Sequence, residues 1–197
     1  MTVTAEDLVA ALAGVVSALA PATTHDWSGV PGTGEHDCRT TAEHLGDCLI
    51  SYAGQLVARP DGRYVRFAAS ADPDASPTEL LEFVVAGGGI LAAVLRGAAP
   101  DARAYHPTGV ADPAGFAGMG CVEALVHGED MARGLGLALD PPRDVCARVL
   151  DRMFPHVRTD VAAMDPWTGL LWATNRLDVP GHYPQTSWRW HAAPLKE

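Results

Sequence analysis

Three side chains that can bind a metal recur at helical spacing in the segment 120–130. Glu123, His127 and Asp130 are separated by four and three residues, so they share one face of an α-helix. A carboxylate and an imidazole on adjacent turns can hold a divalent cation, but such a pair is also common as a solvated contact on a helix surface. The spacing alone leaves both interpretations open.

The apolar residues around this trio favour the metal site. Four of them fall on the same face of the predicted helix: Phe116, Met119, Val122 and Val126. Carboxylates and an imidazole turned toward a core are costly unless they have partners, and a divalent cation is a common partner. We expect Glu123 and His127 to be ligands and Asp130 to orient His127 from behind. Helix capping, or an ion pair with Arg133, is the alternative for Asp130.

A third ligand is expected from an earlier segment. His44 lies near the start of another predicted helix, at the edge of its apolar stripe. Two imidazoles and one carboxylate suit Zn²⁺, with Ni²⁺ or Fe²⁺ as other first-row ions. Three protein ligands leave an open coordination position, which is typical of catalytic sites. Cys48 follows one turn later and could border the site, although a buried cysteine is by default a small apolar residue.

The scaffold for these residues is predicted to be helical. Capping residues, apolar periodicity and terminal proline or glycine predict six helices, the second with Thr40 as its cap: about 4–20, 40–59, 77–97, 113–134 or 136, 140–154 and 166–175. Residues 63–67 fit a short strand or an extended link, and residues 188–190 alternate like a strand. Small residues at 124, 128 and 132, and glycines at 87–89, predict close helix packing. We expect an all-α single domain over residues 1–197, with a helical core at about 4–135 and a C-terminal extension at about 140–197.

The composition agrees with this organisation. The 197 residues are 48% hydrophobic and 19% charged, which is enough apolar material for a core. The net charge of −10 opposes binding to nucleic acid or an anionic membrane. Glu6 and Asp7 precede the first apolar stretch where a signal peptide would carry Lys or Arg, and the run 83–95 is too short to span a membrane. We expect a cytoplasmic monomer or homodimer.

Two segments resemble a known family. Thr41-Ala-Glu-His44-Leu45 and the run from Val122 to Asp130, with Glu123 and His127 in it, are similar to the DinB-like superfamily. The closest type is the N-terminal domain of mycothiol-dependent maleylpyruvate isomerases, and the resemblance covers about residues 4–135. It implies a four-helix bundle with long connections that binds a divalent metal, usually zinc, through His44, Glu123 and His127. It also implies that the metal holds a small thiol, mycothiol, as a thiolate that attacks a small electrophile.

Two functions from different classes follow. The first is a metal-dependent, thiol-using transferase or isomerase, and the second is a non-catalytic helical protein that binds a metal or a small ligand. The segment after residue 140 is shorter than the C-terminal domain of the isomerase, so we do not expect maleylpyruvate as substrate. His36 or Asp37 could alter the metal shell. His106 could overhang the pocket or be an ordinary loop residue, and the tail residues Trp188 and Trp190 fit a packing role better than a ligand cage.

Overall fold

The computed structural model describes residues 2–195, and every regular element within that range is helical. The seven α-helices are α1 (Ala5–Leu19), α2 (Cys38–Ala58), α3 (Pro77–Gly97), α4 (Pro113–Gly134), α5 (Arg143–Met153), α6 (Arg158–Val161) and α7 (Pro166–Ala173). Two 3₁₀ turns, η1 (Ala20–Ala22) and η2 (Pro155–Val157), follow α1 and α5. The predicted all-α class is confirmed.

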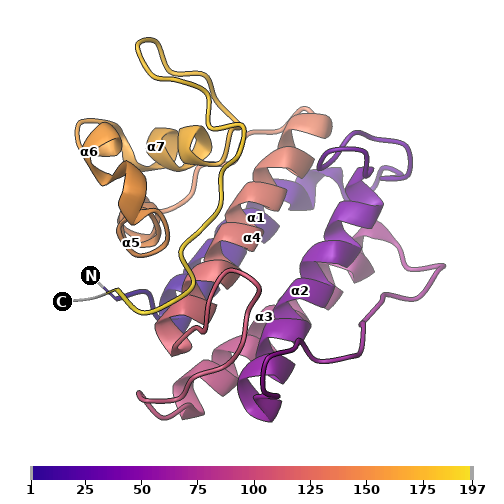
Figure 1. Ribbon diagram of the computed structural model, residues 1–197. Helices are drawn as coiled ribbons and strands as arrows, with labels where there is room; N and C mark the ends of the chain where they lie inside the picture. Colours follow the sequence, from indigo (N-terminus) through magenta and orange to yellow (C-terminus); the bar gives the residue numbers. More distant parts are fainter. Residues whose placement is uncertain (1, 196–197) are drawn as a thin grey trace.

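The four long helices α1–α4 pack against one another, and the short helices form a separate group beside them (Figure 1). Helix α5 contacts both α4 and α7, so it joins this group to the long helices. After α7 the chain turns back and its last part runs along α4 (Figure 1). Helix α4 therefore lies between the two groups, and every residue from Gly115 to Glu129 is buried.

Side-chain caps begin three of the long helices where the sequence predicts them. Thr4 and Ser76 form capping boxes at α1 and α3, and the Asp112 side chain accepts a hydrogen bond from the backbone N–H of Gly115 at the start of α4. The predicted cap of α2 is wrong by three residues. Asp37, rather than Thr40, is its N-cap, because the Asp37 carboxylate accepts the backbone N–H of Thr40 at 2.8 Å.

The start of α5 and the strand predicted at residues 188–190 also differ from expectation, whereas residues 63–67 are a link, one of the two predicted alternatives. Helix α5 begins at Arg143 without a side-chain cap, because Asp140 pairs with Arg143 instead. Residues 63–67 and 188–190 form no strand. In residues 63–67 the backbone is hydrogen-bonded to the buried Gln55 side chain and not to another strand. The Gln55 amide donates to the carbonyl of Arg63 and accepts the backbone N–H of Val65.

Small residues allow the long helices to approach closely, as predicted. A Cβ atom at Gly128 would lie 2.6 Å from a methyl carbon of Val15 in α1. A Cβ at Gly88 would clash with Leu12, and one at Gly87 would lie 3.0 Å from the carbonyl oxygen of Gly46 in α2. Helix packing therefore explains two of the three consecutive glycines in α3.

A buried arginine fastens the C-terminal segment. The guanidinium of Arg152 in α5 donates hydrogen bonds to the carbonyl oxygens of His191 and Ala192, both at 3.0 Å. It also pairs with the Asp112 carboxylate at 2.8 Å. One side chain therefore connects α5, the last residues of the chain and the first turn of α4.

Two helical stretches, Ala5–Ala22 and Pro77–Gly97, are long and apolar enough to cross a membrane by length and composition. In each, 44% of the stretch is buried inside the protein. Core helices of soluble proteins meet the same criteria, so this observation is weak evidence for a membrane segment.

Candidate metal centre

The predicted ligands from α2 and α4 lie next to each other. The ligand atoms of His44, Cys48 and Glu123 are all within 4.8 Å of one another. The rings of His44 and His127 meet edge to face, with centroids 5.1 Å apart. His44 and Cys48 come from successive turns of α2, and Glu123 and His127 come from successive turns of α4, so two i, i+4 pairs face each other.

Glu123 is the centre of this group. One carboxylate oxygen accepts a hydrogen bond from the hydroxyl of Tyr52 at 2.6 Å, and the other lies 2.8 Å from Nε2 of His127. Burial raises the pKa of Glu123, but the hydrogen bond and charge of His127, together with the Tyr52 hydroxyl, outweigh burial and hold the pKa below its ordinary value. Glu123 is therefore a carboxylate although it is only 7% exposed.

Burial also shifts the pKa values of the groups around Glu123, in each case toward the neutral form. Burial, followed by the negative charge of Glu123, raises the pKa of Tyr52 and of Cys48 far above their ordinary values. Burial and then the charge of His127 lower the pKa of His44. Without a cation, Tyr52 is a phenol and Cys48 is a thiol.

A threonine accepts the Nδ1 proton of His127. The hydroxyl of Thr33 donates to Oδ2 of Asp130 at 2.7 Å and lies 2.7 Å from Nδ1 of His127. A hydroxyl carries one proton, and Asp130 accepts that proton, so Nδ1 of His127 must donate to the threonine oxygen. Without a metal, Nε2 donates to Glu123 at 2.8 Å, and a metal would bind Nε2 in place of that proton.

Asp130 acts on His127 through Thr33, since its own oxygen is 4.0 Å from Nδ1. The Asp130 charge is paired with Arg176, the residue that follows α7 by three positions, with distances of 3.0 and 3.4 Å. The alternative partner considered from the sequence, Arg133, pairs with Glu129 at 2.6 Å instead. The guanidinium of Arg176 also lies over the ring of Trp188, 5.5 Å from its centroid.

Aromatic side chains surround the group. The ring of His36 stacks near His44 with centroids 6.4 Å apart. The buried His106 meets the rings of Tyr52 and Tyr64 at 5.9 Å each, and on another side it contacts Trp190 at 6.0 Å. Burial lowers the pKa of His106. His106 therefore lies beside the Tyr52 that holds Glu123, as the sequence had suggested for a residue near the pocket.

This donor set is compatible with a first-row divalent ion. Ligand atoms around zinc lie roughly 3–4 Å apart, because each is about 2.0–2.3 Å from the metal. The ligand atoms of His44, Cys48 and Glu123 lie within 4.8 Å of one another, which is somewhat wider than this, and that group includes Cys48 and not the predicted ligand His127. In addition, the short contact between Glu123 and His127 places a carboxylate oxygen and an imidazole nitrogen where a cation can replace the proton between them.

Sequence reasoning placed His44, Glu123, His127 and Asp130 in one neighbourhood, and the structure brings them together. It missed four residues that complete the network: Thr33, Tyr52, Tyr64 and Arg176. Tyr52 had a visible signal, since it follows Cys48 by one further turn on the same face of the helix. The other three lie in connections outside the helices, where spacing carries no information on contacts.

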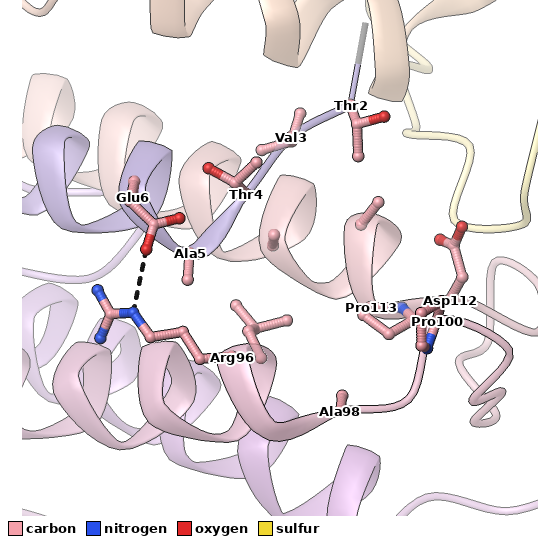
Figure 2. A pocket seen from close by; sticks show the side chains of 13 residues that line it. Thr2, Val3, Thr4, Ala5, Glu6, Arg96, Ala98, Pro100, Asp112 and Pro113 are labelled. Atoms are coloured by element: carbon pink, nitrogen blue, oxygen red, sulfur yellow. Dashed lines mark hydrogen bonds and ion pairs between the residues drawn. The ribbon is translucent and has the colours of Figure 1, made fainter.

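A second cavity, of about 360 Å³, lies where the first turns of α1 and α4 meet the end of α3 (Figure 2). Glu6 and Arg96 face each other at its edge and form an ion pair of 3.0 Å. Asp112 in its wall is paired with Arg152 and caps α4. The charged groups of this cavity are thus engaged with one another, and the cavity contains none of the predicted ligands.

Comparison with known proteins finds no matching family, no matching curated protein and no matching solved structure.

Proposed function

We propose that the protein binds a divalent metal ion, zinc foremost, through His44, Glu123 and His127, and uses it in the transfer or isomerisation chemistry of a small thiol such as mycothiol. The observation that carries the proposal is the group formed by His44, Cys48 and the buried, ionised Glu123, whose ligand atoms lie within 4.8 Å of one another. His127 adjoins this group, with its Nε2 2.8 Å from Glu123 and its ring against that of His44. The resemblance to DinB-like four-helix bundles supports the same ligand set.

Three neighbouring residues position the proposed ligands for a metal ion. Tyr52 holds one oxygen of Glu123, which leaves the other oxygen for a cation. Thr33 and Asp130 keep the proton of His127 on Nδ1, which leaves Nε2 for the same cation. A metal held there would supply a Lewis acid that stabilises the thiolate form of a small thiol near neutral pH.

Cys48 supports a second function, a binding protein without catalysis. Its sulfur is 3.5 Å from Nε2 of His44 and belongs to the same ligand group. If Cys48 becomes a fourth ligand, the coordination sphere is closed, as in structural zinc sites, and a thiol substrate has no position to occupy. The role of Cys48 therefore separates the two functions.

The first experiment measures metal content. Protein purified without a histidine tag should contain about one equivalent of metal by elemental analysis, and the variants His44→Ala, Glu123→Ala and His127→Ala should lose it. His25→Ala, in an exposed loop between α1 and α2, is the matched control and should keep it. Metal-free wild-type protein that also fails to bind added zinc would overturn the proposal.

The second experiment uses cobalt-substituted protein to find the sulfur ligand. In the enzyme proposal, a sulfur-to-cobalt charge-transfer band appears only when mycothiol is added, and Cys48→Ser behaves like wild type. A band that is present without added thiol and disappears in Cys48→Ser would assign the fourth position to Cys48. That result would reject the thiol-using enzyme in favour of the binding protein.

A further inference from the structure

Another cavity, chemically different from the one in Figure 2, lies outside the candidate metal centre. It has a volume of about 700 Å³, which is within the range of small-molecule sites, and it lies between the loop 107–108, residue His156 and the C-terminal segment 185–191. Its lining includes both tail tryptophans, Trp188 and Trp190. In the sequence, these two residues fit a packing role better than a ligand cage.

The charge of this cavity is opposite to that of the whole chain. The protein has a net charge of −10, yet the lining contains no aspartate or glutamate. It contains Arg189, His156 and His191 instead. Among residues 2–195, Arg189 has no carboxylate partner, and no hydrogen bond is made by the rings of the two histidines. The cavity therefore presents one permanent positive charge and two imidazoles to a ligand.

The two tryptophans supply apolar surface beside these donors. Their rings contact each other at a centroid distance of 5.9 Å with a tilt of 57°. The indole N–H of Trp190 is buried and finds no acceptor among the described residues. Planar rings stack favourably on indoles, and a guanidinium binds carboxylates and phosphates with paired hydrogen bonds.

We propose that this cavity binds a small aromatic anion, with its acidic group on Arg189 and its ring against Trp188 and Trp190. The site is separate from the metal ligands. It adjoins their surroundings through two contacts. Trp190 touches His106, the neighbour of Tyr52, and Arg176, the partner of Asp130, lies over the ring of Trp188.

The test follows the indole N–H resonances of the full-length protein by nuclear magnetic resonance. The chain has five tryptophans, and the two in the cavity are assigned with Trp188→Phe and Trp190→Phe. Benzoate and phenyl phosphate are titrated to distinguish a carboxylate from a phosphate ligand. We expect at least one of them to shift the Trp188 and Trp190 signals in a saturable way. Trp27, whose buried N–H donates to the carbonyl of Ala22 at 3.1 Å, should not shift.

Arginine variants test the charge. Arg189→Gln should weaken binding at least about tenfold, since it removes a charge-assisted hydrogen bond. Arg66→Gln, at another exposed arginine, should bind like wild type. Neutral benzamide should bind much more weakly than benzoate.

Three results would overturn the proposal: no shift with either anion, equal binding of benzamide and benzoate, or equal binding by Arg189→Gln and Arg66→Gln. The titration is repeated with His127→Ala, which removes a proposed metal ligand. Unchanged anion binding in that variant is expected, so a failure of the metal centre and a failure of this cavity give different results.

Discussion

Helix α4 packs through small residues on one side and through buried, hydrogen-bonded polar residues on the other. Toward α1 it presents Gly120 and Gly128, where side chains of Leu8 and Val15 approach closely. Toward α2 it presents Glu123 and His127, which are held by hydrogen bonds to Tyr52 and Thr33. Both sides are buried, but only the second buries charge.

The difference shows what burial requires on each side. Apolar contact needs only matching shapes, so small residues allow two helices to approach. A buried carboxylate needs a donor for each oxygen, and every donor must itself be positioned. The side toward α2 therefore depends on residues from several elements, including the loop before α2 and the segment after α7. The predictions below test this contrast in the metal-free protein, except where a metal is named.

The largest effect is expected from Glu123→Ala. This change leaves the Tyr52 hydroxyl and the His127 imidazole without their acceptor in a buried position, and it should lower the free energy of unfolding by about 3–5 kcal/mol. Glu123→Gln keeps an acceptor and should cost less. Guanidinium denaturation measures both variants. Glu6→Ala, at an exposed ion pair, should leave the midpoint unchanged. A Glu123→Ala protein as stable as wild type would contradict the hydrogen-bond account of this side.

On the opposite side, Gly128→Ala should lower the free energy of unfolding by about 1–3 kcal/mol, because the new Cβ would lie 2.6 Å from Val15. The control is Gly89→Ala in α3, where a Cβ meets nothing within 4 Å. That variant should be more stable by about 0.5–1 kcal/mol, since alanine is the better helix former. Thermal denaturation followed by circular dichroism compares the two. Similar effects at both positions would show that close packing does not limit the side toward α1.

Asp130→Asn tests the link through Thr33. The variant removes the charge that holds the Thr33 hydroxyl and fixes the His127 proton, so zinc affinity should fall roughly 10–100-fold. A chelator competition assay measures the affinity. Glu129→Gln, one residue away and paired with Arg133, should bind zinc like wild type. Equal losses in the two variants would point to a general charge effect instead of a positioned hydrogen bond.

The smallest effect is a pH dependence of stability. The pKa values of His44 and His106 are lowered in the folded protein, so the unfolded chain takes up protons first as the pH falls below about 6.5. The pKa of Glu123 is lowered too, which adds a second loss below about pH 4.5. Each group changes the stability by at most about 1.4 kcal/mol per pH unit, and His44 contributes less than His106 because it is exposed.

Denaturation midpoints between pH 8 and pH 4 measure this dependence. His106→Gln should flatten the curve between about pH 6.5 and pH 5, because the buried imidazole no longer titrates. The wild-type curve should then differ from the variant only in that range. A wild-type stability that is constant from pH 7.5 to pH 5 would contradict the predicted proton uptake.

The sequence predicted the helices well because their signals are local. Proline, serine and aspartate at the starts of α3 and α4 act within one turn, and the structure has both helices where the capping residues indicate. The wrong predictions concern features that depend on other residues: the N-cap of α2 and the strand at residues 188–190. Asp37 displaced Thr40 as the cap of α2, and residues 188–190 alternate but have no strand to pair with.

The sequence by itself determined that this chain is helical and that Glu123, His127 and Asp130 share one face of α4, because the period of a helix places residues three and four apart together. Only the tertiary structure decided what meets that face. His44 and Cys48 reach it because α2 packs on α4, whereas Thr33 and Arg176 come from connections whose paths no local rule specifies. Long-range contacts depend on the packing of the whole chain, and they determine which residues pair with the buried charged groups of α4.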